Sequence, residues 1–364
     1  MDKNLKHNYP LYESVPFKNF KELTKVSLEK NPDKDVFVYM ENKEERHVSY
    51  AKHFENMNAL GTAIAHEDFH GRHIAMVGEN CYEWALTQLT VLASDNVYVP
   101  IDKELPMEDL LNVINHSDAE MVFCTGSFAK ALSENQNKLP KVKKFFVYRI
   151  KNELPEGFFD AEAFLEEGRK LYLAGDTSYT SQEPEDMGLG EIVYTSGTTG
   201  APKGVMLSRH NLNASVYYGL MVMCVFDVGL SVLPYNHTYE STCDLLVSQH
   251  YGSTLCINES LKTVADNLKK YQPEYVMLVP LFVETFYKKI WKTLEKSGKA
   301  DLVRKMMKLS NGLRKVGIDL RAKIFKQIRD VFGGRMIMIV CGGAPIRPEI
   351  AEFFDAIGIC LNNG

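Results

Sequence analysis

The chain has 364 residues, of which 45% are hydrophobic and 24% are charged, and its formal net charge is −5. This composition is globular, and the length exceeds what one ordinary core holds, so we expect two or more packed units. The negative charge argues against a nucleic-acid partner, because binding to phosphate backbones requires a broad basic surface.

Short apolar runs alternate with longer amphipathic stretches in the first part of the chain, which predicts a mostly parallel sheet flanked by helices. The stretch 153–189 interrupts this rhythm. It is rich in Gly, Glu, Asp and Ser, so we expect a surface excursion there. The expected strands are 36–40, 73–77, 97–101, 121–124 and 144–147, and the expected helices are 50–66, 82–94 and 107–115.

The alternation then resumes, with expected strands at 192–195, 205–208, 231–233, 254–257, 275–279 and 336–340 and a helix at 211–225. Together these elements predict an α/β protein with two doubly wound subdomains. Their boundary falls in the range 180–230. We place it between residues 185 and 186, so that the units are 1–185 and 186–364.

We expect neither a secretory signal nor a membrane span. Residues 1–7 contain no apolar stretch typical of a secretory signal, and no run of 18 or more apolar residues predicts a membrane span. The seven cysteines are scattered and form no C-x-x-C pair. We therefore expect buried thiols in a reducing, cytoplasmic compartment rather than a metal site.

The most informative stretch is Tyr-Thr-Ser-Gly-Thr-Thr-Gly-Ala-Pro-Lys-Gly, residues 194–204, which lies between two expected strands. Its glycines let backbone N–H groups approach an anion, its hydroxyls can donate to phosphate oxygens, and Lys203 adds a positive charge. We interpret it as a polyphosphate-binding loop. A Walker A loop is disfavoured because Pro202 precedes the lysine and a strand follows. A mobile surface turn is the other alternative, and eleven residues of this composition argue against it.

This stretch resembles the signature Y-T-S-G-T-T-G-x-P-K-G of the adenylate-forming superfamily, which includes acyl-CoA synthetases, luciferases and peptide-synthetase adenylation domains. The resemblance implies that the loop holds the β- and γ-phosphates of ATP, that Lys203 acts in catalysis, and that the hydroxyl of Thr195 helps to position Mg²⁺. The ATP-binding residues implied in the loop are Thr195, Ser196, Gly197, Thr198, Thr199, Gly200 and Lys203.

Three further positions are similar to motifs of the same family. In Leu-Pro-Tyr-Asn-His-Thr-Tyr-Glu, residues 233–240, the resemblance implies that His237 and Tyr239 face the acyl-adenylate, with His237 also catalytic. A structural role for either side chain stays open. Gly-Gly-Ala-Pro at 342–345 resembles the turn against which adenine lies, and Asn363 matches a residue that contacts the adenine amino group. The implied adenine-binding residues are Gly343, Ala344, Pro345 and Asn363.

The chain stops at Gly364, where the family continues with Tyr-Gly-x-Thr-Glu. The resemblance therefore implies the first two α/β subdomains of an acyl-CoA synthetase-like N-terminal domain, without the barrel subdomain and the C-terminal lid. We expect weak or undetectable thioester formation by this chain alone.

Residues 288–330 contain fourteen Lys or Arg against four Asp or Glu, a local charge of +10. A basic amphipathic insertion of this kind favours peripheral contact with the inner face of a membrane, although a solvated helical face has the same pattern. The insertion resembles that of long-chain fatty acyl-CoA synthetases, which implies an acid–thiol ligase that joins a long-chain fatty acid to CoA through acyl-AMP. Activation of an aryl, amino or short-chain acid, with CoA or a carrier protein as acceptor, stays open. So does a non-catalytic nucleotide-binding role.

Overall fold

The computed structural model describes residues 14–195, 202–222 and 225–363. These residues form two compact units. The larger holds the described residues up to 222 together with 234–254, and the smaller holds 225–233 and 255–363. This division differs from the boundary expected between residues 185 and 186, because the strands on both sides of the expected phosphate loop belong to the sheet of the larger unit.

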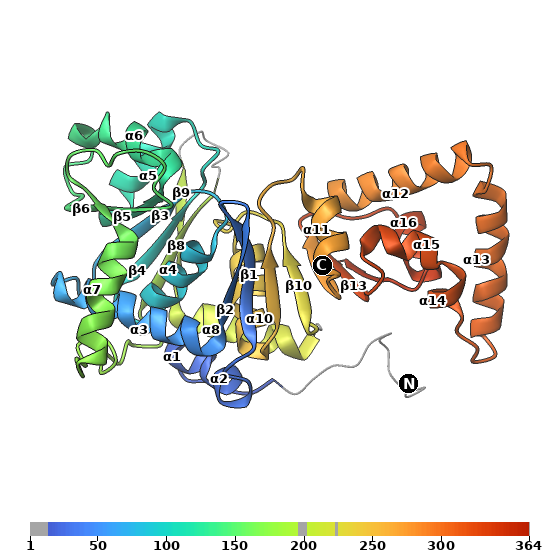
Figure 1. Ribbon diagram of the computed structural model, residues 1–364, viewed down its shortest axis with the longest axis horizontal. Coiled ribbons are helices and arrows are strands. Elements are labelled where there is room, and N and C mark those ends of the chain that lie inside the picture. The colour runs from blue at the N-terminus through green and yellow to red at the C-terminus, as the bar shows by residue number, and fades with distance from the viewer. Residues whose placement is uncertain (1–13, 196–201, 223–224, 364) are drawn as a thin grey trace. The chain divides into compact units, whose positions relative to one another are not determined.

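The larger unit is built on a seven-stranded sheet with the order β7-β6-β5-β3-β4-β8-β9 (Figure 1). Neighbouring strands are parallel except for β9, which runs antiparallel to β8. β1 and β2 form an antiparallel hairpin that belongs to the same unit but is not part of this sheet. The strands are β1 Asp35–Glu41, β2 Glu44–Ser49, β3 His73–Val77, β4 Val97–Ile101, β5 Ala119–Thr125, β6 Lys144–Tyr148, β7 Phe158–Asp160, β8 Leu189–Thr195 and β9 Lys203–Ser208.

Helices cover both faces of this sheet, which confirms the doubly wound arrangement. On one face, Phe145 and Val147 of β6 join a core that includes apolar residues of α5 and α6. On the other face, Phe146 stacks on Phe164 of α7 at 4.1 Å between ring centroids, and the Tyr148 hydroxyl lies 3.1 Å from the Thr87 hydroxyl of α4. The helices are α1 Phe20–Leu23, α2 Lys25–Lys30, α3 Tyr50–His66, α4 Tyr82–Leu92, α5 Met107–His116, α6 Gly126–Ser133, η1 Gln136–Lys138, α7 Ala161–Leu173, α8 Arg209–Val222, α9 Thr238–Glu240, η2 Ser241–Leu246 and α10 Val247–Tyr251.

The stretch 153–189, where we expected a surface excursion, contains regular secondary structure. It contains β7 and the 13-residue helix α7, which begins after Asp160, whose carboxylate accepts hydrogen bonds from the N–H groups of Glu162 and Ala163. The helix packs closely against α3, since a Cβ atom on Gly168 would overlap the carbonyl oxygen of Ala59. Its buried Ala161, Phe164 and Gly168 follow a helical spacing that the polar residues between them obscure.

The smaller unit contains strands in the order β14-β13-β12-β10-β11, and β10, β12, β13 and β14 run parallel (Figure 1). These are β10 Val228–Ser231, β11 Thr254–Ile257, β12 Tyr275–Leu278, β13 Met338–Cys341 and β14 Cys360–Asn363. The basic segment 288–330 is helical, as expected. The helices are α11 Val264–Tyr271, α12 Pro280–Lys296, α13 Ala300–Arg314, α14 Arg321–Ile324, α15 Lys326–Arg329, η3 Asp330–Phe332 and α16 Pro348–Ala356.

An aromatic cluster forms part of the core of the smaller unit. Phe332 lies 5.3 Å from Phe286 of α12 and 5.6 Å from Phe354 of α16, measured between ring centroids, so these helices share one apolar layer. Among the residues that the structure describes, no helix has the length and apolar character needed to cross a bilayer. The described cysteines are free thiols.

Candidate functional site

The expected phosphate loop closes a β-hairpin. β8 and β9 pair in an antiparallel register that places Thr195 opposite Lys203, and both side chains are exposed. Directly opposed residues of such a pair have Cβ atoms about 4.5–5.5 Å apart, so a hydroxyl and an ammonium group flank the base of the loop. The predicted loop residues Ser196, Gly197, Thr198, Thr199 and Gly200 lie outside the described residues.

The residue pair next to this base supports the hairpin. Tyr194 lies opposite Gly204, and a Cβ atom at Gly204 would come within 3.3 Å of the tyrosine ring and 2.9 Å of Ile192. The Tyr194 hydroxyl and Nδ1 of His116 share a hydrogen bond of 2.8 Å. Burial raises the pKa of Tyr194 to about 12, which keeps the hydroxyl protonated at neutral pH. A cavity of about 670 Å³ borders Tyr194, His116 and Pro202.

Arg209 holds the other end of the hairpin. It follows β9 directly, and its side chain is buried. The guanidinium donates hydrogen bonds to the carbonyl oxygens of Leu92 (3.2 Å), Ser94 (2.6 Å), Asn96 (2.7 Å) and Leu189 (2.9 Å). One side chain therefore ties the first residue of β8 to the turn between α4 and β4. Sequence reasoning missed this role, because the four acceptors are backbone atoms distant in sequence.

Glu191, in the middle of β8, is fully buried. Neither of its carboxylate oxygens has a hydrogen-bond partner among the described residues. Burial raises its pKa to about 8, so the side chain is mostly protonated at neutral pH. Its partner across the sheet, Tyr98 of β4, is also fully buried. The strand that carries Thr195 thus contains a neutral acid, and a glutamate within an otherwise apolar run was the signal for it.

His237 lies in a tight turn before α9. Its N–H donates to the carbonyl oxygen of Pro234 at 3.2 Å, and its own carbonyl oxygen accepts from the N–H groups of Glu240 and Ser241, both at 3.0 Å. The backbone of His237 is therefore fixed, while its side chain is exposed. Tyr239, two residues later, is half-buried.

Tyr235 anchors this turn to the larger unit. Its ring is buried and packs edge-on against Trp84 of α4, with 6.4 Å between centroids. Its N–H donates to Oδ1 of Asn80 at 3.2 Å. The strand–proline–aromatic pattern in the sequence therefore positions His237 through its buried neighbour Tyr235.

The turn continues into η2, one π-helical segment that the sequence pattern did not reveal. Short π-helical segments are frequent at functional sites. The segment packs against α8, whose Leu212, Val216 and Leu220 are buried. These three residues form the core face of α8. Buried polar residues of η2 and the residue before it are Glu240, Ser241, Thr242 and Asp244.

In the smaller unit, the expected adenine-binding turn follows β13 directly. The N–H of Gly342 donates to the carbonyl oxygen of Leu278 at 3.2 Å, which continues the pairing of β12 and β13 into the turn. Gly343 has a φ of +88°, a conformation that favours glycine. Apart from its chain neighbours, no atom of the described residues lies within 4 Å of the position of a Cβ there. Ala344 and Pro345 are exposed. Small residues at this end of a parallel strand leave room for a flat ligand.

Asn363 lies at the same edge of the sheet. It pairs with Cys341, the last residue of β13, and therefore with the strand end from which the turn begins. Its side chain is exposed. The structure thus brings Asn363 and the 342–345 turn together at the carboxyl ends of two neighbouring parallel strands.

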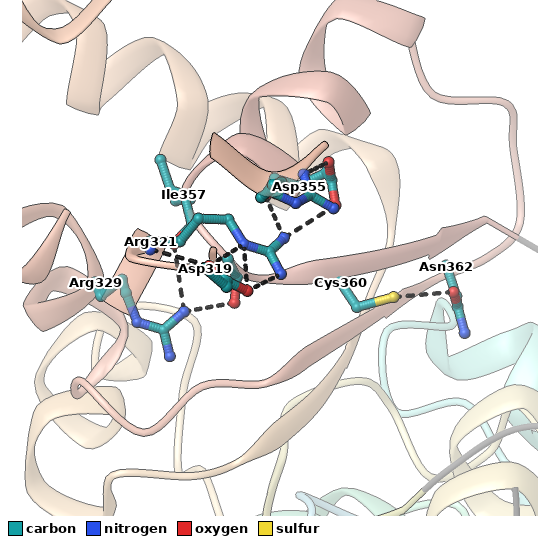
Figure 2. Close-up of polar contacts among 9 residues, drawn as sticks. Asp319, Arg321, Arg329, Asp355, Ile357, Cys360 and Asn362 are labelled. Atoms are coloured by element: carbon teal, nitrogen blue, oxygen red, sulfur yellow. Dashed lines mark hydrogen bonds and ion pairs between the residues drawn. The ribbon is translucent and has the colours of Figure 1, made fainter. Parts of the chain in front are cut away.

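An ion-pair network fixes α16 and the approach to β14 (Figure 2). Figure 2 shows Arg321 between Asp319 and Asp355. The Nη2 atom of Arg321 is 2.7 Å from the Asp319 carboxylate, and its Nη1 atom is 3.2 Å from the Asp355 carboxylate. Hydrogen bonding to Arg321 lowers the pKa of Asp319 to about 2. Arg329 donates to the carbonyl oxygens of Gly358 (2.6 Å) and Met336 (2.9 Å). These contacts fix the segment that leads to Asn363, and no pattern in the sequence indicates them.

The described site residues therefore fall into three groups. Thr195 and Lys203 face each other on the hairpin, His237 and Tyr239 lie in the turn before η2, and the 342–345 turn adjoins Asn363. The first two groups belong to the larger unit and the third to the smaller.

Residues 24–364 match the family model described as AMP-binding enzyme. A long chain acyl-CoA synthetase of Arabidopsis thaliana is 27% identical, covering 92% of this chain and 54% of the relative. A chloroplastic long-chain-fatty-acid–acyl-carrier-protein ligase of the same plant is 26% identical, covering 80% and 47%. The solved adenylation domain of a carboxylate reductase from Mycobacterium chelonae aligns with a TM-score of 0.73 at 20% identity, covering 96% of this chain and 58% of that domain. The chain spans about half the length of the curated relatives it matches.

Proposed function

Because the chain belongs to the AMP-binding enzyme family and has the α/β fold of an adenylation domain, we propose that it takes part in the ATP-dependent activation of a carboxylic acid. A carboxylate oxygen of the acid attacks the α-phosphorus of ATP, the bond from that phosphorus to the bridging oxygen breaks, and acyl-AMP and pyrophosphate form. The thiol of CoA then displaces AMP from the acyl carbon and yields the thioester. The substrate supplies the nucleophile, so the protein contributes alignment and charge stabilisation.

The observation that carries this proposal is the register of the hairpin, which sets Lys203 opposite Thr195 at the base of a loop rich in glycine and hydroxyl groups. Lys203 would offset the negative charge of the β- and γ-phosphates, and the loop N–H groups would bind their oxygens. A hydroxyl such as that of Thr195 suits Mg²⁺, which keeps several waters and takes most of its other ligands from substrate phosphates. The ion would neutralise charge on the phosphates, and Thr195 would orient it.

The remaining groups would contact the other parts of the acyl-adenylate. The exposed imidazole of His237, held by its fixed backbone, would lie against the acyl-phosphate end, with Tyr239 beside it. The adenine ring would rest on Gly343, Ala344 and Pro345. The side-chain amide of Asn363 would form a hydrogen bond with the adenine amino group.

We propose a long-chain fatty acid as the substrate and CoA as the acceptor. The first support is the likeness to a long chain acyl-CoA synthetase. The second is the basic helical segment 288–330, whose exposed Leu309, Val316 and Ile318 accompany its +10 charge. Such a surface suits peripheral contact with an anionic membrane, in which a long-chain fatty acid partitions. The likeness to an acyl-carrier-protein ligase favours a carrier protein as the second candidate acceptor.

The phosphate role is tested with Lys203→Ala. We expect the variant to bind ATP at least about tenfold more weakly, which corresponds to about 1.4 kcal/mol, because one charged contact to the phosphates is lost. Lys130→Ala is a matched control, since Lys130 is an exposed lysine of the same unit outside the three groups. ATP affinity can be measured by calorimetric titration of this chain in the presence of Mg²⁺. Equal affinities for wild type and Lys203→Ala would show that the hairpin is not the phosphate site.

The substrate is tested by pyrophosphate release from the full-length protein with palmitate or benzoate, followed by thioester formation with CoA or acyl-carrier protein. Release with palmitate and transfer to CoA is the expected result. Release with benzoate alone would overturn the fatty-acid proposal and leave the adenylation proposal intact.

A further inference from the structure

The basic segment of the smaller unit encloses a groove between helices. α12 and α13 meet near residue 298, and α14 and α15 lie beside them (Figure 1). The cavity between these four helices and α11, which we call the helical groove, has a volume of about 790 Å³. Sites for one small ligand usually measure about 300–1,000 Å³, so the helical groove has the size of a ligand site.

The floor of the helical groove is apolar. Phe286 and Ile290 come from α12, Val303 comes from α13, and Phe325 and Ile328 come from the α14–α15 region; all five are buried. A floor of this kind receives a hydrocarbon chain favourably, at about 25 cal/mol for each Å² of apolar surface removed from water.

The rim of the helical groove is basic. Its lining includes Lys269, Lys289, Lys299, Lys323 and Lys326, and the lining residues include no aspartate or glutamate. Lys326 pairs with Asp330, which lies outside the lining. In the described part of the chain the other four lysines form no ion pair. Their charges are therefore available to an anionic group at the mouth of an apolar cavity.

We propose that the helical groove binds a free long-chain fatty acid, with the hydrocarbon chain on the apolar floor and the carboxylate at the lysine rim. The apolar interior of the cavity matches the hydrocarbon chain, and the positive charges at its rim match the negative carboxylate. A bounded cavity suits a single chain. Contact with a bilayer surface would instead use the exposed Leu309, Val316 and Ile318 outside the helical groove. This site shares no residue with the phosphate hairpin, the 234–240 turn or the 342–345 turn, so it does not depend on the function proposed above.

The first test compares two leucines of α13. Leu302 lines the helical groove and is 56% exposed, whereas Leu309, two turns later, is outside it and 63% exposed. Replacing either by glutamate alters an exposed side chain, so both variants should fold. With cis-parinaric acid as the probe, we expect Leu302→Glu to weaken binding at least about tenfold and Leu309→Glu to stay within about twofold of wild type.

The second test addresses the rim. The double variant Lys289→Glu, Lys323→Glu reverses the sign of two rim charges, and Lys305→Glu, Lys308→Glu makes the same change on exposed lysines of α13 outside the lining. We expect only the first pair to weaken binding of the probe. Palmitate should displace the probe from wild type, and hexadecanol, which has an equally long chain without the carboxylate, should do so far less well.

Three results would overturn the proposal. One is equal binding by wild type and Leu302→Glu, and another is equal displacement by palmitate and hexadecanol. The third is a Leu302→Glu variant that binds vesicles of anionic phospholipid more weakly than wild type but binds the probe equally well. That result would identify a membrane contact instead. Pyrophosphate release from the full-length protein tests the adenylation proposal separately. A variant that loses binding to the helical groove but releases pyrophosphate normally leaves the adenylation proposal intact. Normal binding to the helical groove in a protein that releases no pyrophosphate leaves the groove proposal intact.

Discussion

Glu191 lies in the middle of the strand that leads to the phosphate hairpin, and its replacement by glutamine retains the size and polarity of the side chain while removing the titratable proton. In the native protein this carboxyl is fully buried, neither of its oxygens has a hydrogen-bond partner among the described residues, and its pKa is raised from 4.5 to about 8 by burial. In the unfolded chain the carboxyl is solvated and its pKa returns to the ordinary value.

The sign of the pH dependence follows from these two pKa values. Between pH 4.5 and pH 8 the native state retains a proton that the unfolded state has lost, so the free energy of unfolding decreases as the pH rises through this window. The slope approaches about 1.4 kcal/mol per pH unit for one group. From pH 5.5 to pH 8 the wild type should therefore lose roughly 3 kcal/mol that Glu191→Gln retains.

The measurement is urea unfolding of both proteins at several pH values, with the free energies subtracted at each pH so that other titrating groups cancel. The chain has two tryptophans, Trp84 in the larger unit and Trp291 in the smaller. In a Trp291→Phe background, fluorescence reports on Trp84, which is buried in the same unit as Glu191. Glu156→Gln, at an exposed position of that unit, is the control and should change stability by less than about 0.5 kcal/mol throughout.

A difference between Glu191→Gln and the wild type that stays constant from pH 5.5 to pH 8 would refute the reasoning. It would mean that the native carboxyl is solvated or charge-paired, and that its pKa is close to that of the unfolded chain. A difference that grows by several tenths of a kcal/mol per unit, without reaching the full slope, would indicate a smaller shift of the same direction and cause.

Two further predictions concern packing within the larger unit. Arg209→Met should lower the free energy of unfolding by about 3 kcal/mol or more, because the buried carbonyl groups bound by the guanidinium lose their donor. Arg209→Lys should recover part of this loss. A change below about 1 kcal/mol for Arg209→Met in urea unfolding would show that Arg209 does not hold the hairpin in place. Gly168→Ala should lower the free energy of unfolding by about 1–3 kcal/mol, because the new methyl group overlaps the Ala59 carbonyl. Gly219→Ala in α8 should raise it by about 0.5–1 kcal/mol, because no described atom outside the local helix backbone lies within 4 Å of the new methyl group. Shifts of the midpoint of thermal unfolding in the same direction for both variants would contradict this reasoning.

Much of the sheet of the larger unit could be predicted because its strands are buried on both faces. A parallel strand covered by helices on both sides reads as a continuous apolar run, as β4 does at residues 97–101, where the expected and observed bounds coincide. The helix at 50–66 was also predicted with its observed bounds, since it begins at a serine cap and carries a long apolar face. One element that escaped prediction is β14, whose polar sequence Cys-Leu-Asn-Asn forms a strand because it pairs with β13.

The site shows the same limit. The hairpin could be inferred from two short strands around a glycine-rich loop, and its register placed Thr195 and Lys203 opposite each other. The contact between Tyr194 and His116 joins residues 78 positions apart, and nothing in either local pattern indicates it. The helical groove has a similar origin, because Lys269 of its rim comes from α11, before the basic segment begins. Such contacts depend on tertiary packing, which periodicity does not encode.

The way the two units share the chain also has a consequence for its synthesis. Residues 225–233, including β10, leave the ribosome before residues 234–254, which the larger unit needs for completion. β10 cannot pair with its parallel neighbour β12 until β12 is synthesised, about 40 residues later. At roughly 5–20 residues per second, this interval is about 2–8 seconds. During that time an apolar strand with an unpaired edge is attached to a nearly finished domain, so this stretch of the nascent protein is the one we expect chaperones to protect.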